Sequence, residues 1–157
     1  MIQITFPDGN FRTYEKGVNS IDIAKSISEG LARNVLAAKV NGKVQDATLA
    51  IQEDASLQLL TWNDEEGKST MWHSSAHLMA EALEFHFPGI KLAIGPPVTN
   101  GFYYDIDFEN YSIKEEDLPK IEAKILELAR EKNSFIRKEI SKPEAIDYFT
   151  KKMIPTN

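Results

Sequence analysis

Hydrophobic and polar residues alternate at the very start of the chain. Apolar side chains at positions 2, 4 and 6 are separated by glutamine and threonine, a period of two that predicts a strand with one buried face. The residues that follow, 7–10 (Pro-Asp-Gly-Asn), are of the types that favour a tight turn. Residues 11–14 are then expected to return as the second arm of a hairpin.

The next fifty residues add one helix and further strands. Apolar residues between 21 and 31 recur at helical spacing, and Asn19 or Ser20 is expected to cap this helix. Strands are predicted over 35–40 and 56–62, with a tight turn at Asn41-Gly42 after the first of them. This order of elements predicts an α+β fold of the β-grasp, ubiquitin-like kind for residues 1–62.

A second pattern begins after a polar stretch at residues 63–68, which we assign as a linker between two domains. Residues 69–157 are expected to form an α+β domain of their own. Apolar residues at helical spacing predict helices over 70–87 and 114–132. Short strands are expected over 91–94, 101–106 and 135–140.

The last predicted element is a helix that begins with a capping box. Ser141 can cap the first turn, and Glu144, three residues later, can bond back to the backbone of the capping residue. We expect this helix to run to about residue 151.

Composition and charge narrow the possible functions. With no cysteine, the chain has neither disulfide bonds nor thiolate chemistry. No apolar run reaches the ~20 residues of a membrane span, and the start lacks the layout of a signal peptide, so a cytoplasmic protein is expected. The net charge is −6, whereas non-specific nucleic-acid binders usually carry a basic excess. Neither half is basic, since residues 1–62 hold 6 basic and 7 acidic side chains and residues 63–157 hold 12 and 17.

Two of the three histidines, His73 and His77, lie four residues apart within a predicted helix, so both imidazoles leave the same face. The spacing alone allows three interpretations. The pair could be half of a zinc site, although the glutamate of His-Glu-x-x-His metalloproteases is missing and no cysteine can add a ligand. It could position or exchange protons with a bound ester while water attacks. Both side chains could also be structural, half-buried and hydrogen-bonded between helices.

A loop that follows this helix could supply the other side of a pocket. Residues 94–97 (Ile-Gly-Pro-Pro) are rigid, and the Asn-Gly turn of residues 100–105 (Asn-Gly-Phe-Tyr-Tyr-Asp) allows a close backbone approach. In a strand, Tyr103 and Tyr104 point to opposite faces, so one of them can present its hydroxyl to a cleft. The alternative is that both tyrosines are ordinary strand aromatics.

These motifs resemble those of a known family. His73-Ser-Ser-Ala-His77, followed by Leu92-Ala-Ile-Gly-Pro-Pro97 and Asn100-Gly-Phe-Tyr-Tyr-Asp105, closely resembles the amino-terminal editing domain of bacterial threonyl-tRNA synthetases. Residues 1–62 resemble the TGS domain that precedes the editing domain in this family. The resemblance covers residue 1 to about residue 151, in the domain order of the family.

The resemblance implies hydrolytic proofreading of mischarged seryl-tRNA. A threonine pocket rejects serine weakly, because one methyl group is worth only ~1–3 kcal/mol, and a second, hydrolytic site corrects the error. By position, His73, His77 and Tyr104 look like members of that editing cleft, which works without a bound metal in the family.

Cofactors and partners also follow from the resemblance. The ATP, magnesium and zinc of the family belong to a catalytic core outside this chain, so no cofactor is expected here. The implied partner is the tRNA specific for threonine, and full-length members are homodimers. No membrane partner is expected.

The resemblance also marks features that are missing. In the family the editing cleft continues with a lysine, an aspartate and a Cys-x-x-x-His segment, and residues 153–157 do not resemble the Tyr-Lys pair usually found there. We therefore expect an amino-terminal fragment of an aminoacyl-tRNA ligase, with a natural, frameshifted or engineered end. Such a fragment would not charge tRNA and would hydrolyse seryl-tRNA little or not at all. The alternative is a stand-alone TGS-type RNA-binding or regulatory module without hydrolase activity.

Overall fold

The computed structural model describes residues 1–152, and expectations about residues 153–157 lie outside this range. The chain divides into two compact units. Unit 1 consists of residues 1–76 and 95–103, and unit 2 consists of residues 77–94 and the chain from Tyr104 onward. Within residues 1–152, no helix has both the length and the apolar composition that spanning a bilayer requires.

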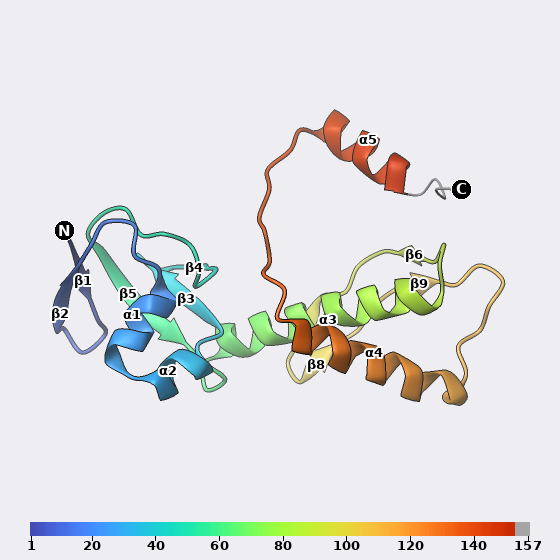
Figure 1. Ribbon diagram of the computed structural model, residues 1–157, viewed down its shortest axis with the longest axis horizontal. Helices are drawn as coiled ribbons and strands as arrows, with labels where there is room; N and C mark the ends of the chain where they lie inside the picture. Colours follow the sequence, from blue (N-terminus) through green and yellow to red (C-terminus); the bar gives the residue numbers. More distant parts are fainter. Residues whose placement is uncertain (153–157) are drawn as a thin grey trace. The chain divides into compact units, whose positions relative to one another are not determined.

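Unit 1 contains a five-stranded mixed sheet in the order β2-β1-β5-β3-β4 (Figure 1). β1 pairs antiparallel with β2 and parallel with β5, and β3 pairs antiparallel with both β4 and β5. The elements are β1 (Ile2–Thr5), β2 (Phe11–Tyr14), α1 (Ser20–Ile27), α2 (Glu29–Asn34), β3 (Ala37–Val40), β4 (Lys43–Gln45) and β5 (Ala55–Leu60). This arrangement confirms the predicted α+β, β-grasp fold.

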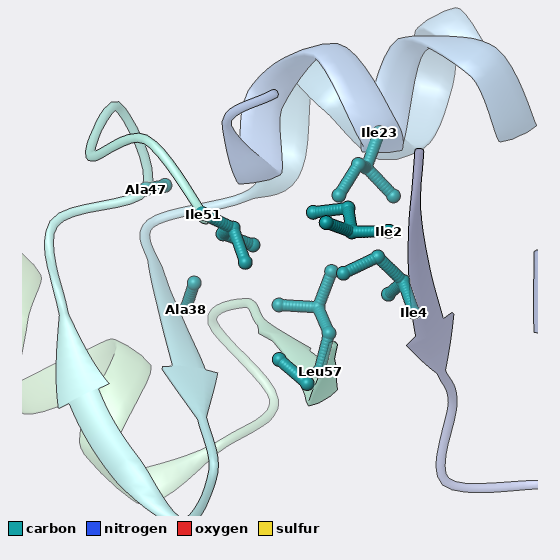
Figure 2. Close-up of a cluster of buried hydrophobic side chains, with 8 residues drawn as sticks. Ile2, Ile4, Ile23, Ala38, Ala47, Ile51 and Leu57 are labelled. Carbon is teal, nitrogen blue, oxygen red and sulfur yellow. The ribbon is translucent and has the colours of Figure 1, made fainter. Parts of the chain in front are cut away.

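The core of unit 1 lies between α1 and one face of the sheet. Ile4 on β1, Ile23 on α1 and Leu57 on β5 are almost completely buried and point toward one another (Figure 2). Ile2 and Ala38 complete the sheet side of this cluster. The buried residues on β1 are two apart, as the alternation of apolar and polar residues predicted.

Local capping explains where the first helices begin and end. The Asn19 side chain accepts a hydrogen bond from the backbone N–H of Asp22, 2.9 Å away, which fixes the start of α1. The predicted helix would have continued to Leu31, but Ser28 adopts an extended conformation (φ −164°) and starts α2 by accepting from the N–H of Leu31. A serine hydroxyl that bonds the backbone locally competes with a continuous helix.

The segment assigned as a linker, residues 63–68, is largely helical. The helix α3 (Glu65–His86) begins there rather than at residue 70, and it contributes to both units. Asp64 fixes this start, because its carboxylate accepts the Thr61 N–H at 2.8 Å and its carbonyl accepts the Lys68 N–H at 2.9 Å. Acidic residues are favourable in a first helical turn, so the polar character of the segment suits a helix start as well as a linker.

Unit 2 is built around the second half of α3 and the helix α4 (Leu118–Glu131), which lie side by side (Figure 1). Ala82 and Leu83 of α3 pack with Ile121 and Leu128 of α4 in a small hydrophobic core. The remaining elements of this unit are β6 (Lys91–Leu92), β9 (Ile106–Asp107), a 3-10 turn η1 (Glu115–Asp117) and α5 (Lys142–Lys152). The hairpin of β7 (Pro97–Val98) and β8 (Gly101–Phe102) belongs to unit 1.

Two expectations for the end of the chain had different outcomes. The capping box is confirmed, since the Ser141 N–H and hydroxyl donate to the Glu144 carboxylate at 2.8 and 2.6 Å and α5 follows. The predicted strand over 135–140 is wrong, because residues 133–141 form neither helix nor strand. An alternating apolar pattern becomes a strand only beside a partner strand, and within residues 1–152 no strand pairs with this segment.

A buried carboxylate organises the start of α4. Asp117 is only 2% exposed, and its side chain accepts the Tyr111 hydroxyl (2.6 Å) and the Lys114 backbone N–H (2.9 Å). It also forms an ion pair of 2.6 Å with Lys120, whose ammonium lies over the Phe87 ring. Hydrogen bonds from Lys120, Tyr111 and the Lys114 N–H hold the pKa of Asp117 far below its usual range. The same carboxylate raises the pKa of Tyr111.

Unit 2 should therefore lose stability in acid. The pKa of Asp117 is lower in the folded state than its unfolded value of ~3.9, so its contribution is complete above about pH 5 and is lost as the pH falls. The raised pKa of Tyr111 has the opposite sign, and its contribution is lost above about pH 10. Urea titrations followed by the NMR signals of α4 at several pH values will measure both limits.

Two variants separate this effect from general acid denaturation. Asp117→Asn is expected to lower the urea midpoint at neutral pH and to weaken its dependence on pH below 5. Glu116→Gln is the matched control, because the Glu116 side chain is 75% exposed and its contact with Lys114 is a loose 3.6 Å. An Asp117→Asn protein with the wild-type pH profile would show that the carboxylate does not stabilise the unit.

Candidate functional site

The helix α3 carries both histidines singled out from the sequence. His73 and His77 are separated by one helical turn, and both side chains are exposed rather than enclosed in packing. The apolar side of the helix is where the sequence placed it, with Ala76 and Leu83 buried and Met79 half-buried. The two imidazoles therefore lie where a ligand in solution can reach them.

His77 has an aromatic neighbour that the sequence did not reveal. The Phe135 ring meets the His77 imidazole edge-on, with 6.5 Å between the ring centroids. Phe135 lies in the irregular segment that was predicted to be a strand, and its side chain is otherwise exposed. No spacing signal connects residues 58 positions apart, so only the folded chain shows this contact.

Tyr104 lies on a two-stranded ribbon in unit 2. β6 and β9 pair antiparallel, and two further backbone hydrogen bonds between residues 93–94 and Asp105 extend the ribbon. The predicted continuous strand over 101–106 is wrong, because it is split into β8 and β9. Tyr103 is 51% exposed and Tyr104 is half-buried, but neither lies within a strand, so their predicted placement on opposite faces stays a prediction.

The ribbon borders a hollow that Tyr104 helps to line. A shallow recess of about 520 Å³ is lined by Lys91, Leu92, Ala93, Tyr104, Asp105, Ile106 and Asp107. At this recess, the Lys91 ammonium is 2.9 Å from the Glu109 carboxylate and 3.9 Å from that of Asp107. The hydrogen bond to Glu109 raises the pKa of Lys91, so this side chain stays protonated and paired with carboxylates at the recess.

The Gly-Pro-Pro loop forms a second hollow, in unit 1. Trp72 of α3 packs between Trp62 and Phe102, with ring centroids 5.4 and 6.4 Å apart. An open groove of about 510 Å³ beside it is lined by Glu65, Glu66, Lys68, Ser69, Trp72, Pro97, Val98 and Thr99. The Glu65 and Glu66 carboxylates in this groove already pair with Lys68 and Lys39. The loop therefore packs against a tryptophan near the start of α3, while Tyr104 belongs to the ribbon of unit 2.

The chemistry available at these positions is acid–base and hydrogen-bonding chemistry. Imidazoles exchange protons near neutral pH, and a phenol can donate a hydrogen bond to an ester or a ribose hydroxyl. Among residues 1–152, no group of three or more histidine, aspartate or glutamate side chains is placed to hold a metal ion. Bringing His73, His77 and Tyr104 together in one site remains a prediction.

Comparison with known proteins shows what this chain is similar to. Residues 2–61 match the model of the TGS domain. The chain is 63% identical over 155 residues to a threonine–tRNA ligase of Cytophaga hutchinsonii, which covers 99% of this chain and 24% of that protein. It is 57% identical over 150 residues to the threonine–tRNA ligase of Porphyromonas gingivalis and 54% identical over 149 residues to that of Bacteroides thetaiotaomicron, in each case 95% of this chain and 23% of the relative.

The chain thus spans about a quarter of the length of these curated relatives. The resemblance was expected to end at about residue 151. The match to the Cytophaga protein covers 155 of the 157 residues, so this similarity continues past residue 151. Residues 2–61 thus match a TGS domain, and the chain as a whole matches the amino-terminal region of threonine–tRNA ligases over nearly its entire length.

Proposed function

We propose that this chain is the tRNA-handling, amino-terminal part of a threonine–tRNA ligase, and that His73, His77 and Tyr104 take part in hydrolytic editing of mischarged seryl-tRNA. The relatives are named as threonine–tRNA ligases, which supports tRNA specific for threonine as the partner. The location that we propose is the cytoplasm. The observation that carries the editing role is the exposure of both imidazoles of the pair on one helix. A substrate in solution can reach exposed imidazoles.

In this proposal the histidines act on the ester that joins serine to the terminal ribose. One imidazole holds the attacking water or the ribose hydroxyl, and hydrogen bonding from the Tyr104 phenol orients the substrate. Water attacks the ester carbonyl carbon, the bond to the ribose oxygen breaks, and that oxygen takes up a proton. The products are serine and uncharged tRNA.

A binding experiment on this chain tests the proposal without requiring turnover. The probe is adenosine joined to serine at its 3′ position through an amide, which water does not cleave readily. We expect the probe to shift the ring NMR signals of His73 and His77. His86 is an internal control, because it lies nine residues beyond His77, about 14 Å along the helix, and its Nε2 is 3.1 Å from the Lys120 carbonyl oxygen.

Two variants make the outcome specific. His77→Ala and Tyr104→Phe are each expected to weaken binding of the probe, while His86→Gln should leave it unchanged. If the probe shifts none of the histidine signals at millimolar concentration, or shifts all three alike, the editing assignment for these residues is wrong.

A further inference from the structure

One short segment of this acidic chain is strongly basic. Residues 132–142, here called the basic strip, carry four basic side chains against one acidic, so the strip has a net charge of +3 within a chain whose net charge is −6. The basic members are Lys132, Arg137, Lys138 and Lys142. Counting charge over whole halves of the chain conceals this local excess.

The strip is open to solvent along its length. Every residue from 132 to 142 is exposed, and Ile136 is 89% exposed. Residues 133–141 form neither helix nor strand, so backbone N–H groups along the segment are not engaged in a ladder. Arg137 pairs with Glu139 in a contact whose two side chains are 72% and 75% exposed, and such exposed pairs are weak enough to exchange for a phosphate.

The contact between Phe135 and His77 places the strip beside the predicted editing residues. Their ring centroids are 6.5 Å apart, and Arg137 follows Phe135 by only two residues, at most about 7 Å of chain. Exposed cations that lie next to an aromatic and an apolar side chain suit a single-stranded nucleic acid, whose phosphates and bases they contact together. The strip is thus both chemically and spatially matched to the end of an RNA.

We infer that the basic strip binds the phosphates of the single-stranded 3′ end of the tRNA and guides its terminal ribose toward His77. This inference rests on the proposed editing function, because that function requires the ester to lie at the histidine pair. Arg137 and Lys138 are positioning residues in this scheme. They contact the RNA backbone and take no part in proton transfer.

The experiment measures binding of uncharged tRNA specific for threonine to this chain by fluorescence anisotropy, between about 50 and 200 mM salt. The double variant Arg137→Ala/Lys138→Ala is expected to raise Kd about tenfold. It should also reduce the slope of log K against log salt by about 1.5, because each lost phosphate contact lowers the slope by about 0.7–0.9. Circular dichroism will verify that the helices of the variant are unchanged.

A control variant and a second probe locate the effect. Lys16→Ala/Lys43→Ala removes the same charge from exposed positions in unit 1 and should leave Kd within about twofold of wild type. The second probe is the same tRNA without its four 3′-terminal nucleotides. Wild type and the Arg137→Ala/Lys138→Ala variant should bind this shortened tRNA equally.

The inference is overturned if wild type does not bind tRNA at low salt, or if the Arg137→Ala/Lys138→Ala variant keeps the wild-type Kd and slope. It is also overturned if the control variant loses as much tRNA affinity, or if wild type and the Arg137→Ala/Lys138→Ala variant still differ in Kd for the shortened tRNA. These results are distinguishable from a failure of the editing proposal. The seryl-adenosine probe carries no phosphate, so its binding tests the histidines independently of the strip.

Discussion

Replacing His77 by alanine in a full-length ligase that carries this sequence should slow the hydrolysis of seryl-tRNA by about 100-fold or more. A side chain that moves or orients a proton in the transition state contributes about 10²- to 10⁴-fold, and alanine removes it entirely. Net formation of seryl-tRNA should rise as a result. The measurements are the decay of purified seryl-tRNA and the accumulation of seryl-tRNA during charging with serine.

Threonine activation is the internal control for this prediction, because the editing proposal places no part of that reaction at His77. Its rate should stay unchanged, and His86→Gln, which alters the third histidine of the chain, should affect neither reaction. If His77→Ala leaves seryl-tRNA hydrolysis at the wild-type rate, or if threonine activation falls in parallel, His77 has no specific role in editing.

Gly67→Ala should be the most destabilising single methyl addition in unit 1. A Cβ at position 67 would lie 2.0 Å from the Thr61 carbonyl oxygen and 2.8 Å from its carbon, distances that require the backbone to move. Overpacking of this kind costs about 1–3 kcal/mol and occasionally more. Both tryptophans, Trp62 and Trp72, lie in unit 1, so urea unfolding followed by tryptophan fluorescence reports the stability of that unit.

Gly30→Ala is the matched control, because it adds the same methyl group to a helix without a clash. A Cβ at position 30 would have its nearest neighbour, the Ser28 hydroxyl oxygen, 4.0 Å away. Alanine is the better helix former by about 1 kcal/mol, so this variant should be slightly more stable than wild type. A loss of stability in Gly30→Ala equal to that in Gly67→Ala would attribute both effects to something other than the close approach at Thr61.

The β-grasp unit could be predicted from sequence because its signals are local. Alternating residues mark β1, an asparagine caps α1, and the Asn41-Gly42 turn requires the positive φ angles that both residues adopt, 48° and 77°. Each of these signals involves residues within four positions of one another. They survive in the fold because the hydrophobic core buries the same faces.

The break of the first predicted helix at Ser28 has a local cause, but other errors occurred where contacts outside the local pattern decide the structure. The start of α3 at Glu65 depends on a glycine that lets the helix approach Thr61, a contact that a polar linker pattern cannot reveal. The segment 135–140 has the composition of a strand but no partner strand within residues 1–152. Local sequence therefore predicted which residues could form a strand, and pairing with another strand determined whether they formed one.

The features of the candidate site also fall into two groups, those that local sequence predicted and those that depend on contacts between separate elements. The spacing of His73 and His77 could be read directly, because both belong to one helix. The contact of His77 with Phe135, the recess beside Tyr104 and the hydrogen bonds to Asp117 join residues from separate elements or loops. Of these three features, only the hydrogen bonds to Asp117 had a signal in the sequence, because Asp117 is an acidic residue near the start of the helix predicted over 114–132.

The position of His73 and His77 on one face of α3 depends on the four-residue spacing between them. One inserted residue between Ala76 and His77 would rotate all later side chains by about 100° about the helix axis, and two would rotate them by about 200°. Either change would turn His77 away from the helix face that carries His73. Proteins that use both imidazoles together should consequently keep this spacing free of insertions and deletions.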